Sequence, residues 1–176
     1  MGKSSLLNSL MGRHRLARTS STPGCTRLIG FYEARLSDGA VLRLVDLPGY
    51  GYAKRARSER IAWGAMVETY LLARPTLAAV VALVDVRRGI EADDWDLLRV
   101  AQVTPQVRRA PVHSLLVATK LDKLPRTQHK PTLSRLSKQA GCPVVGFSIR
   151  DPESPTELWR RLRRLLGLEG ARVSER

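Results

Sequence analysis

The chain has 176 residues, enough for a single domain with a hydrophobic core, and a formal charge of +14 that suits a partner rich in phosphate. No apolar run approaches the roughly 18 residues of a membrane-spanning helix, which argues against a membrane partner. Its two cysteines, Cys25 and Cys142, are too few and too far apart for a disulfide framework or a metal site, so we expect a cytoplasmic protein.

The chain begins with Met1-Gly2-Lys3-Ser4-Ser5, and a helical stretch starts at Leu6. Gly-Lys-Ser is the second half of a phosphate-binding P-loop, G-x-x-x-x-G-K-[S/T]. In that loop, backbone N–H groups, the helix N-terminus and the lysine surround the β- and γ-phosphates of a nucleotide. A tripeptide of common residues also occurs by chance. The segments that follow must therefore show whether Gly-Lys-Ser belongs to a nucleotide site or to a solvent-exposed N-terminus.

The next segment, Thr22–Arg27, is a Pro-Gly loop that leads into an alternating strand, Leu28–Leu36. A loop threonine can complete a magnesium shell and contact a γ-phosphate, because magnesium prefers hard oxygen ligands. Thr26 is the candidate for this role. The alternative is a plain turn before a strand.

A hairpin signal, Ser37-Asp38-Gly39, connects this strand to a second one, Val41–Val45, which ends in Asp46-Leu47-Pro48-Gly49. An aspartate at the end of a buried strand can hold magnesium through water. The backbone N–H of Gly49 can contact the γ-phosphate and register its loss.

A base-reading element is predicted at Thr119–Asp122, directly after the apolar run Val112–Ala118. One carboxylate can accept hydrogen bonds from both the ring imino and the exocyclic amino group of guanine, and adenine lacks that pair of donors. Asp122 would therefore select GTP over ATP, while Lys120 lays its methylene stem over the base. A helix cap at Asp122 is the alternative. The last apolar strand, Val144–Ser148, is suited to present backbone N–H groups to the guanine carbonyl.

Apolar strands alternate with helical patterns through the rest of the chain, which predicts an α/β fold with a mostly parallel sheet covered on both faces and one antiparallel hairpin strand. Residues 1–167 would form one GTP-binding domain, and residues 168–176 a basic tail. The expected helices are Ser58–Leu72, Ala92–Val103, Gln128–Gln139 and Thr156–Leu166, and the further strand is Leu77–Val84.

The order and wording of these motifs resemble the EngB/YsxC family of bacterial ribosome-assembly GTPases, within the Ras-like translation-factor class. The resemblance covers nearly the whole chain and stops after about Gly167. It rests on Asp-Leu-Pro-Gly-Tyr-Gly-Tyr-Ala-Lys at 46–54, Ala-Arg-Thr-Ser-Ser-Thr-Pro-Gly at 17–24, Trp63-Gly64, Asp-Val-Arg-Arg-Gly-Ile at 85–90, and Thr-Lys-Leu-Asp-Lys-Leu at 119–124.

Two departures from the family pattern have consequences. Cys25 stands where similar proteins usually carry arginine, which would alter the effector loop but leave Thr26 free to act. Similar proteins also have roughly twenty or more residues before the P-loop lysine, including the strand that feeds it. We therefore expect Met1 to be a misassigned start, with an in-frame valine codon read as the initiator.

The resemblance places that first strand at the centre of the sheet, between Val41–Val45 and Leu77–Val84, so we expect its absence to split the sheet. Unsatisfied buried backbone groups cost about 1–3 kcal/mol each, against a domain stability of about 5–15 kcal/mol. The chain as written is then marginal or unfolded unless a nucleotide or partner stabilises it.

The resemblance and the motifs together define a site for GTP or GDP and magnesium. The expected magnesium ligands are Ser4, Thr26 and Asp46, and the residues expected to act in hydrolysis are Lys3, Thr26 and Gly49. The expected nucleotide contacts are Gly2, Lys3, Ser4, Ser5, Gly24, Cys25, Thr26, Arg27, Leu28, Asp46, Leu47, Pro48, Gly49, Thr119, Lys120, Leu121, Asp122, Phe147, Ser148 and Ile149.

Hydrolysis is expected to be slow without a partner, because Tyr50 follows Gly49 at the place where many relatives carry a water-orienting glutamine. The resemblance implies a monomer that acts as a switch in assembly of the large ribosomal subunit, with rRNA and ribosomal proteins as partners and an association with cell division and septation.

Basic residues at Arg55, Arg57 and Arg60, and at Arg160, Arg161, Arg163 and Arg164, are candidates for RNA contacts or merely solvated faces. The alternatives are a P-loop ATPase, a basic RNA-binding protein without a nucleotide switch, and an inactive remnant.

Overall fold

A computed structural model describes residues 2–13, 16–17, 29–36, 39–47, 57–102 and 111–168. Within them every expected helix and strand is present, with ends displaced by at most a few residues. The elements are α1 (Lys3–Leu10), β1 (Gly30–Arg35), β2 (Val41–Asp46), α2 (Arg57–Ala73), β3 (Ala79–Asp85), α3 (Ala92–Gln102), β4 (His113–Thr119), the 3₁₀ turn η1 (Leu121–Lys123), α4 (Arg126–Ala140), β5 (Val144–Phe147) and α5 (Ser154–Leu165).

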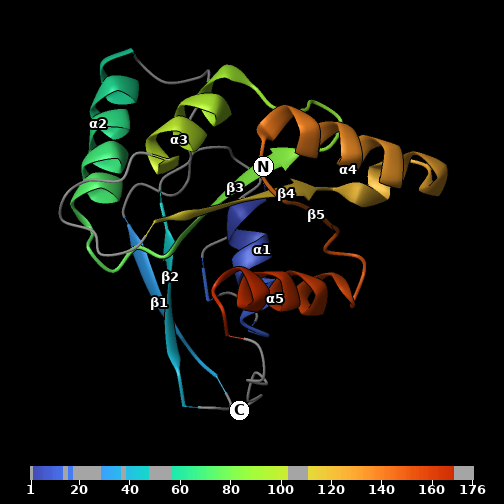
Figure 1. Cartoon of the computed structure of the whole chain (residues 1–176), viewed down its shortest axis with the longest axis horizontal. Coiled ribbons are helices and arrows are strands. Elements are labelled where there is room, and N and C mark those ends of the chain that lie inside the picture. Colours follow the sequence, from blue (N-terminus) through green and yellow to red (C-terminus); the bar gives the residue numbers. More distant parts are fainter. Residues whose placement is uncertain are drawn as a thin grey trace.

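The described strands form two separate sheets, in line with the expectation that the sheet would be split. β3, β4 and β5 pair in parallel, while β1 and β2 form an antiparallel hairpin. Among the described strands, none joins β2 to β3. Figure 1 shows the hairpin standing apart from the parallel sheet and running in a different direction.

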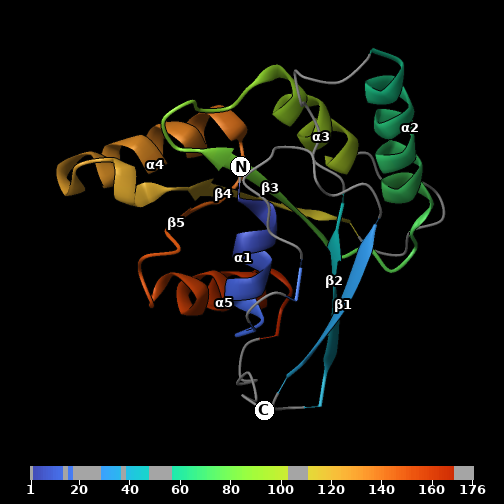
Figure 2. The same cartoon turned by 180° about the vertical axis from the view of Figure 1, so that it is seen from behind.

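β4 is the centre of the parallel sheet, and its side chains alternate between two helical layers. Leu115 and Val117 pack with α1 and α5, where Leu158 and Trp159 belong to the same cluster. Leu116 lies on the opposite face with residues of α3 and α4. A strand covered on both faces needs a continuous apolar run rather than an alternating one, and the sequence Ser-Leu-Leu-Val-Ala provides it. Figure 2 shows α1 and α5 together on one side and α3 and α4 on the other.

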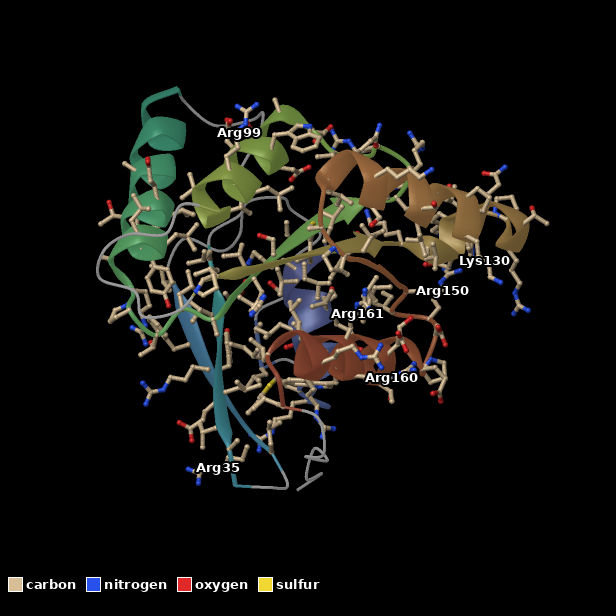
Figure 3. The ribbon with its side chains drawn as sticks, in the orientation of Figure 1. Arg35, Arg99, Lys130, Arg150, Arg160 and Arg161 are labelled. Atoms are coloured by element: carbon tan, nitrogen blue, oxygen red, sulfur yellow. The ribbon has the colours of Figure 1, made fainter. Side chains whose placement is uncertain are left out.

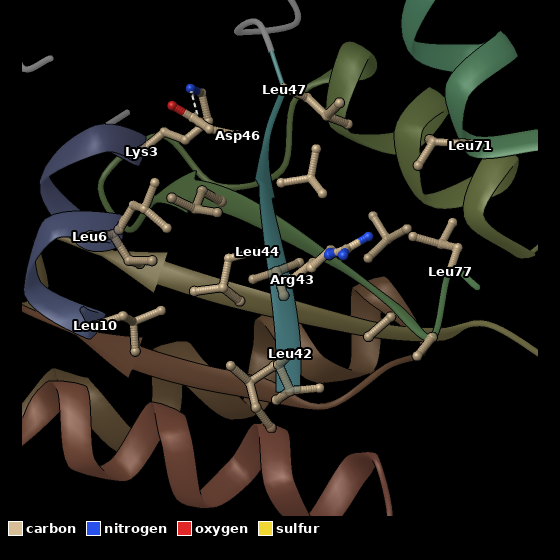
Figure 4. Close-up of a pocket in the computed structure, with 18 of the residues that line it drawn as sticks. Lys3, Leu6, Leu10, Leu42, Arg43, Leu44, Asp46, Leu47, Leu71 and Leu77 are labelled. Atoms are coloured by element: carbon tan, nitrogen blue, oxygen red, sulfur yellow. Dashed lines mark hydrogen bonds and ion pairs between the residues drawn. The ribbon is translucent and has the colours of Figure 1, made fainter. Parts of the chain in front are cut away.

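A cavity of about 570 Å³ lies where the two sheets fail to meet. Side chains of β2, β3, α1, α2 and α5 line it, and Figure 4 shows Leu42 and Leu44 of β2 facing Leu6 and Leu10 of α1 across it. β3 borders this cavity and is only half covered: Val80 is buried, whereas Val81 and Leu83 are half-buried. The split sheet therefore leaves an apolar strand with an open edge.

Within the described ranges, no helix combines the length and apolarity needed to cross a membrane.

Candidate nucleotide-binding site

The phosphate end of the site begins at Gly2, the residue before α1. Gly2 has φ 88°, a left-handed conformation that favours glycine, and its carbonyl oxygen accepts a hydrogen bond from Leu6 N at 2.9 Å. Lys3 opens the helix immediately afterwards, so its side chain and the N–H groups of the first turn lie at the positive end of the helix dipole. This geometry suits an anion.

Lys3 forms an ion pair with Asp46, and the pair joins the start of α1 to the end of β2 (Figure 4). The Asp46 residue is only 5% exposed. A buried carboxylate needs a charged or hydrogen-bonding partner, and the Lys3 ammonium provides one. Two residues predicted from separate motifs, 43 positions apart, are thus brought together. Ser4 and Ser5 follow on the first turn of α1 and are half-buried.

The end of α1 is fixed by two further contacts that the sequence patterns did not reveal. The indole Nε1–H of Trp159 donates to the Leu10 carbonyl oxygen at 2.8 Å. Asn8 exchanges two hydrogen bonds with the backbone of Ala17, at 2.7 and 3.0 Å. Both contacts hold the helix that carries Lys3, and neither residue type at those positions gives a signal without the tertiary structure.

The predicted base-reading end lies at the carboxyl ends of β4 and β5. Ser148 follows β5, and its hydroxyl donates to Asp122 Oδ1 at 2.8 Å. This hydrogen bond, with smaller contributions from the charges of Lys123 and Arg150, lowers the pKa of the Asp122 carboxyl. Asp122 is therefore held in place as an ionised acceptor, which is the state that a guanine imino and amino pair requires.

Lys120 lies between β4 and η1 in a left-handed conformation, with φ 60°, alone among the described non-glycine residues in having positive φ. Its ammonium lies 3.0 Å from Asp85 Oδ2. Arg87 binds the same carboxylate, with Nε to Oδ1 at 2.9 Å and Nη2 to Oδ2 at 2.7 Å. These hydrogen bonds, led by those from Arg87, keep the pKa of Asp85 well below its usual range despite burial.

Asp85 was not among the residues predicted for the site, although a signal for it exists. It ends β3 after the apolar run Ala-Val-Val-Ala-Leu-Val, as Asp46 ends β2. The register of β3 and β4 pairs Asp85 with Thr119, which places the aspartate beside the next residue, Lys120. A strand that ends in aspartate is common, and only the pairing identifies its neighbour.

Close packing fixes the segment that carries Asp122. Thr119 donates its hydroxyl hydrogen to the Val84 carbonyl oxygen at 2.9 Å. A Cβ on Gly146 of β5 would come within 2.6 Å of a Leu121 methyl carbon, so glycine leaves room for that side chain. Leu121 therefore packs directly on β5 and connects η1 to the last strand.

The remaining predicted residues differ in where they lie. The Phe147 residue is 1% exposed and packs in the core with α1 and α5, so its side chain does not face a base. Ile149 is 68% exposed, and Leu47 is half-buried beside α2 and α3. The predictions for Gly24, Cys25, Thr26, Arg27, Leu28, Pro48 and Gly49 lie outside the described residues.

Both ends of the site lie on one side of the parallel sheet. Figures 1 and 2 show the start of α1 beside the carboxyl end of β3. β4 runs parallel to β3, and its last residue, Thr119, pairs with Asp85 and precedes Lys120. Ligands of open α/β sheets bind at the carboxyl ends of the strands. The arrangement therefore places a helix start suited to an anion at one end and a hydrogen-bonded carboxylate at the other.

Known proteins share this pattern. Residues 1–120 match the family model described as 50S ribosome-binding GTPase. The chain is 41% identical over 179 residues to the probable GTP-binding protein EngB of Myxococcus xanthus, covering 98% of this chain and 84% of that protein. It is 45% identical over 163 residues to the corresponding protein of Streptococcus agalactiae serotype III, covering 90% and 77%.

Solved structures agree on the fold. A crystal structure of a probable GTP-binding protein engB superposes with a TM-score of 0.65 at 16% identity, covering 94% of this chain and 93% of that one. The bacterial selenocysteine-specific elongation factor EF-Sec superposes with a TM-score of 0.63 at 21% identity, covering 94% of this chain and 27% of the factor. The Ras-like GTPase fold is thus confirmed, and on sequence similarity the chain belongs to the EngB family of GTP-binding proteins.

Proposed function

We propose that this chain binds GTP and GDP through Lys3 and Asp122, hydrolyses GTP slowly with magnesium, and acts as a switch in assembly of the large ribosomal subunit. The observation that carries the proposal is the hydrogen bond from Ser148 to Asp122. It fixes one ionised carboxylate at the strand ends, where the two donors of guanine can pair with it.

The phosphate end supports magnesium through its donor set. Magnesium binds hard oxygen ligands and is usually held by one or two carboxylates, hydroxyls, waters and the phosphates themselves. Asp46 and the Ser4 hydroxyl fit that chemistry, and Thr26 is the third proposed ligand. When bound, the ion neutralises charge that develops on the phosphates. Lys3 would contribute a second positive charge at the phosphates. It would then release its ion pair with Asp46, whose carboxylate would hold the metal.

The slow rate is proposed from Tyr50, which stands where many relatives in the wider class place a glutamine. A phenol is a poor substitute for an amide that orients water. Lys3, Thr26 and Gly49 would then bind and sense the γ-phosphate, while a partner completes the site. Turnover of tens per second by the isolated protein would contradict this part of the proposal.

A ribosomal precursor in the cytoplasm is the proposed partner, and its RNA supplies the phosphate. The formal charge of +14 supports this. Arg160 and Arg164 lie on the exposed side of α5, one turn apart. Figure 3 shows Arg150, Arg160 and Arg161 on and beside α5, with Lys130 on α4. The side chains of Arg57 and Arg60, and all of Arg55, lie outside the described structure. The association with cell division and septation stays a proposal from the resemblance.

RNA affinity should fall steeply with salt, because neutralised phosphates release counterions. Affinity for a large-subunit RNA fragment, measured by filter binding at several salt concentrations, should give a slope of log K against log salt that is shallower for Arg160→Gln/Arg164→Gln than for the wild type. Equal slopes would remove α5 from the proposed surface.

The nucleotide part is tested by titrating the chain with fluorescent GDP and magnesium, then competing with unlabelled GTP and ATP. We expect displacement by GTP at micromolar concentration and none by ATP. Equal displacement would favour a P-loop ATPase. RNA binding without any nucleotide binding would favour a basic protein without a switch.

A further inference from the structure

The carboxylate of Asp85 is buried and fully engaged at the end of β3. Oδ1 accepts from the backbone N of Arg87 at 3.1 Å and from its Nε at 2.9 Å. Oδ2 accepts from Arg87 Nη2 at 2.7 Å and lies 3.0 Å from Lys120 Nζ. The side chain of Asp85 is 6% exposed, that of Arg87 50% and that of Lys120 41%. Asp85 is therefore the buried residue of this cluster, and the more exposed side chains of Arg87 and Lys120 contact it from the surface.

We infer that Asp85 is a positioning residue for the nucleotide site: with Arg87 holding its carboxylate, it anchors the tip of the Lys120 side chain so that the methylene stem lies ready against the guanine base. The inference rests on the proposed function of Lys120 and Asp122 at the base.

The physical reason is the flexibility of lysine. A free lysine side chain has four rotatable carbon bonds and loses substantial rotamer freedom when a ligand orders it. Anchoring Nζ on a buried carboxylate removes most of that freedom before the nucleotide arrives, and preorganisation of this kind improves affinity. The ammonium is engaged by Asp85, which leaves the methylene stem as the surface available to a base.

The bidentate contact with Arg87 fixes the orientation of the Asp85 carboxylate, which is the anchor for Lys120. A planar guanidinium that binds both carboxylate oxygens fixes the plane of the Asp85 carboxyl, whereas Lys120 contacts it as a point charge. The register that pairs Asp85 with Thr119, together with the hydrogen bond from Thr119 to Val84, ties the ends of the two strands together. The anchor therefore belongs to the rigid sheet and not to a loop.

The test is a double-mutant cycle on the full chain, with fluorescent GDP as the probe. Asp85→Asn retains the shape of the side chain but removes its charge, and Lys120→Met keeps an apolar stem without the ammonium. We expect Asp85→Asn to weaken GDP binding about ten-fold in the wild-type background and less than about two-fold in the Lys120→Met background. Asp96→Asn is the matched control, since that aspartate lies on α3 with a 56% exposed side chain, and should leave affinity unchanged.

A second readout needs no nucleotide. After reductive ¹³C-methylation, the Lys120 signal of the unliganded chain should shift in Asp85→Asn and stay in place in Asp96→Asn. An unchanged Lys120 signal, or the same loss of affinity from Asp85→Asn in both backgrounds, overturns the inference while leaving the proposed function intact. Failure of the wild-type chain to bind GDP, with the lysine signal shifting as expected, overturns the proposed function and with it the role at the base.

Discussion

The proposed base site depends on the hydroxyl group of Ser148. Its Oγ donates to Asp122 and accepts from the backbone N of Arg150 at 3.1 Å, so it links the carboxylate to the loop after β5. The Ser148 residue is 5% exposed, which shields both bonds from water. Without this link the carboxylate of Asp122 keeps only the longer ion pairs of its Oδ2 with Lys123 at 3.7 Å and Arg150 at 3.8 Å among the contacts described.

Ser148→Ala should weaken GDP binding several-fold, since a hydrogen bond to a charged group contributes about 1.5–3 kcal/mol and other partners of Asp122 compensate in part. Isothermal titration with GDP measures the effect. Ser134→Ala, a change at an exposed position on α4, is the matched control. Affinity equal to that of the wild type would show that Asp122 needs no support from β5.

The sequence predicted the residues that belong to recognisable nucleotide-binding motifs. It did not predict the residues that hold those side chains in position. Lys3, Asp46 and Asp122 were identified because each follows or begins an element within a recognisable pattern. Asp85, Asn8 and Trp159 act across the fold, at contacts set by strand register and helix packing. Asp85 begins the Asp-Val-Arg-Arg-Gly-Ile string of the family resemblance, but that string does not identify its contact with Lys120. No short window of sequence distinguishes Asn8 or Trp159 from ordinary polar or core residues.

The elements were predictable because their patterns are simple. β4 is apolar on both faces, and α5 places Leu158, Trp159 and Leu162 on one buried side. The observed ends of an element differ from the predicted ends where the sequence has no strong cap. α4 begins at Arg126 without a side-chain cap, two residues before its expected start. Its end at Gly141 is sharper, because φ 63° favours glycine and the Gly141 N–H bonds to Ser137.

Pro131 makes α4 less stable than a helix of the same length without a proline. It lies inside the helix at an exposed position and cannot donate the hydrogen bond expected to Thr127. Pro131→Ala should stabilise the domain by about 1–3 kcal/mol, measured as the free energy of unfolding in urea. Gln139→Ala, at an exposed position in the same helix, should change it by less than about 0.5 kcal/mol. A loss of stability in Pro131→Ala would show that the proline ring packs favourably.

On the scale of the whole molecule, the split sheet is the feature with the greatest energetic consequence. Its division was expected from the family resemblance, which places a further strand between β2 and β3. The cavity between the parts was not expected, because its shape depends on how α1, α2 and α5 pack. β4 has neighbours on both sides, and its residues from Leu115 to Thr119 are buried. β3 has one paired neighbour among the described strands, and its inner residues border empty space.

Shortening a side chain on β4 should therefore cost more unfolding free energy than shortening the same side chain on β3. Val117→Ala removes methyl groups from a site that is 0% exposed and should cost about 2–3 kcal/mol of unfolding free energy. Val81→Ala removes the same groups beside the cavity and should cost about 1 kcal/mol, since fewer contacts are lost. Urea denaturation of both variants gives the comparison. Equal costs would mean that the cavity is closed in solution.

Recognition of guanine by Asp122 is tested by an exchange of base specificity. Asp122→Asn replaces an acceptor with an amide that also donates, and xanthine has a carbonyl where guanine has its exocyclic amino group. We therefore expect GDP affinity to fall by about 100-fold or more and XDP to become the preferred ligand, measured by competition against fluorescent nucleotide. An Asp122→Asn protein that still prefers GDP over XDP would contradict the assignment of the base site.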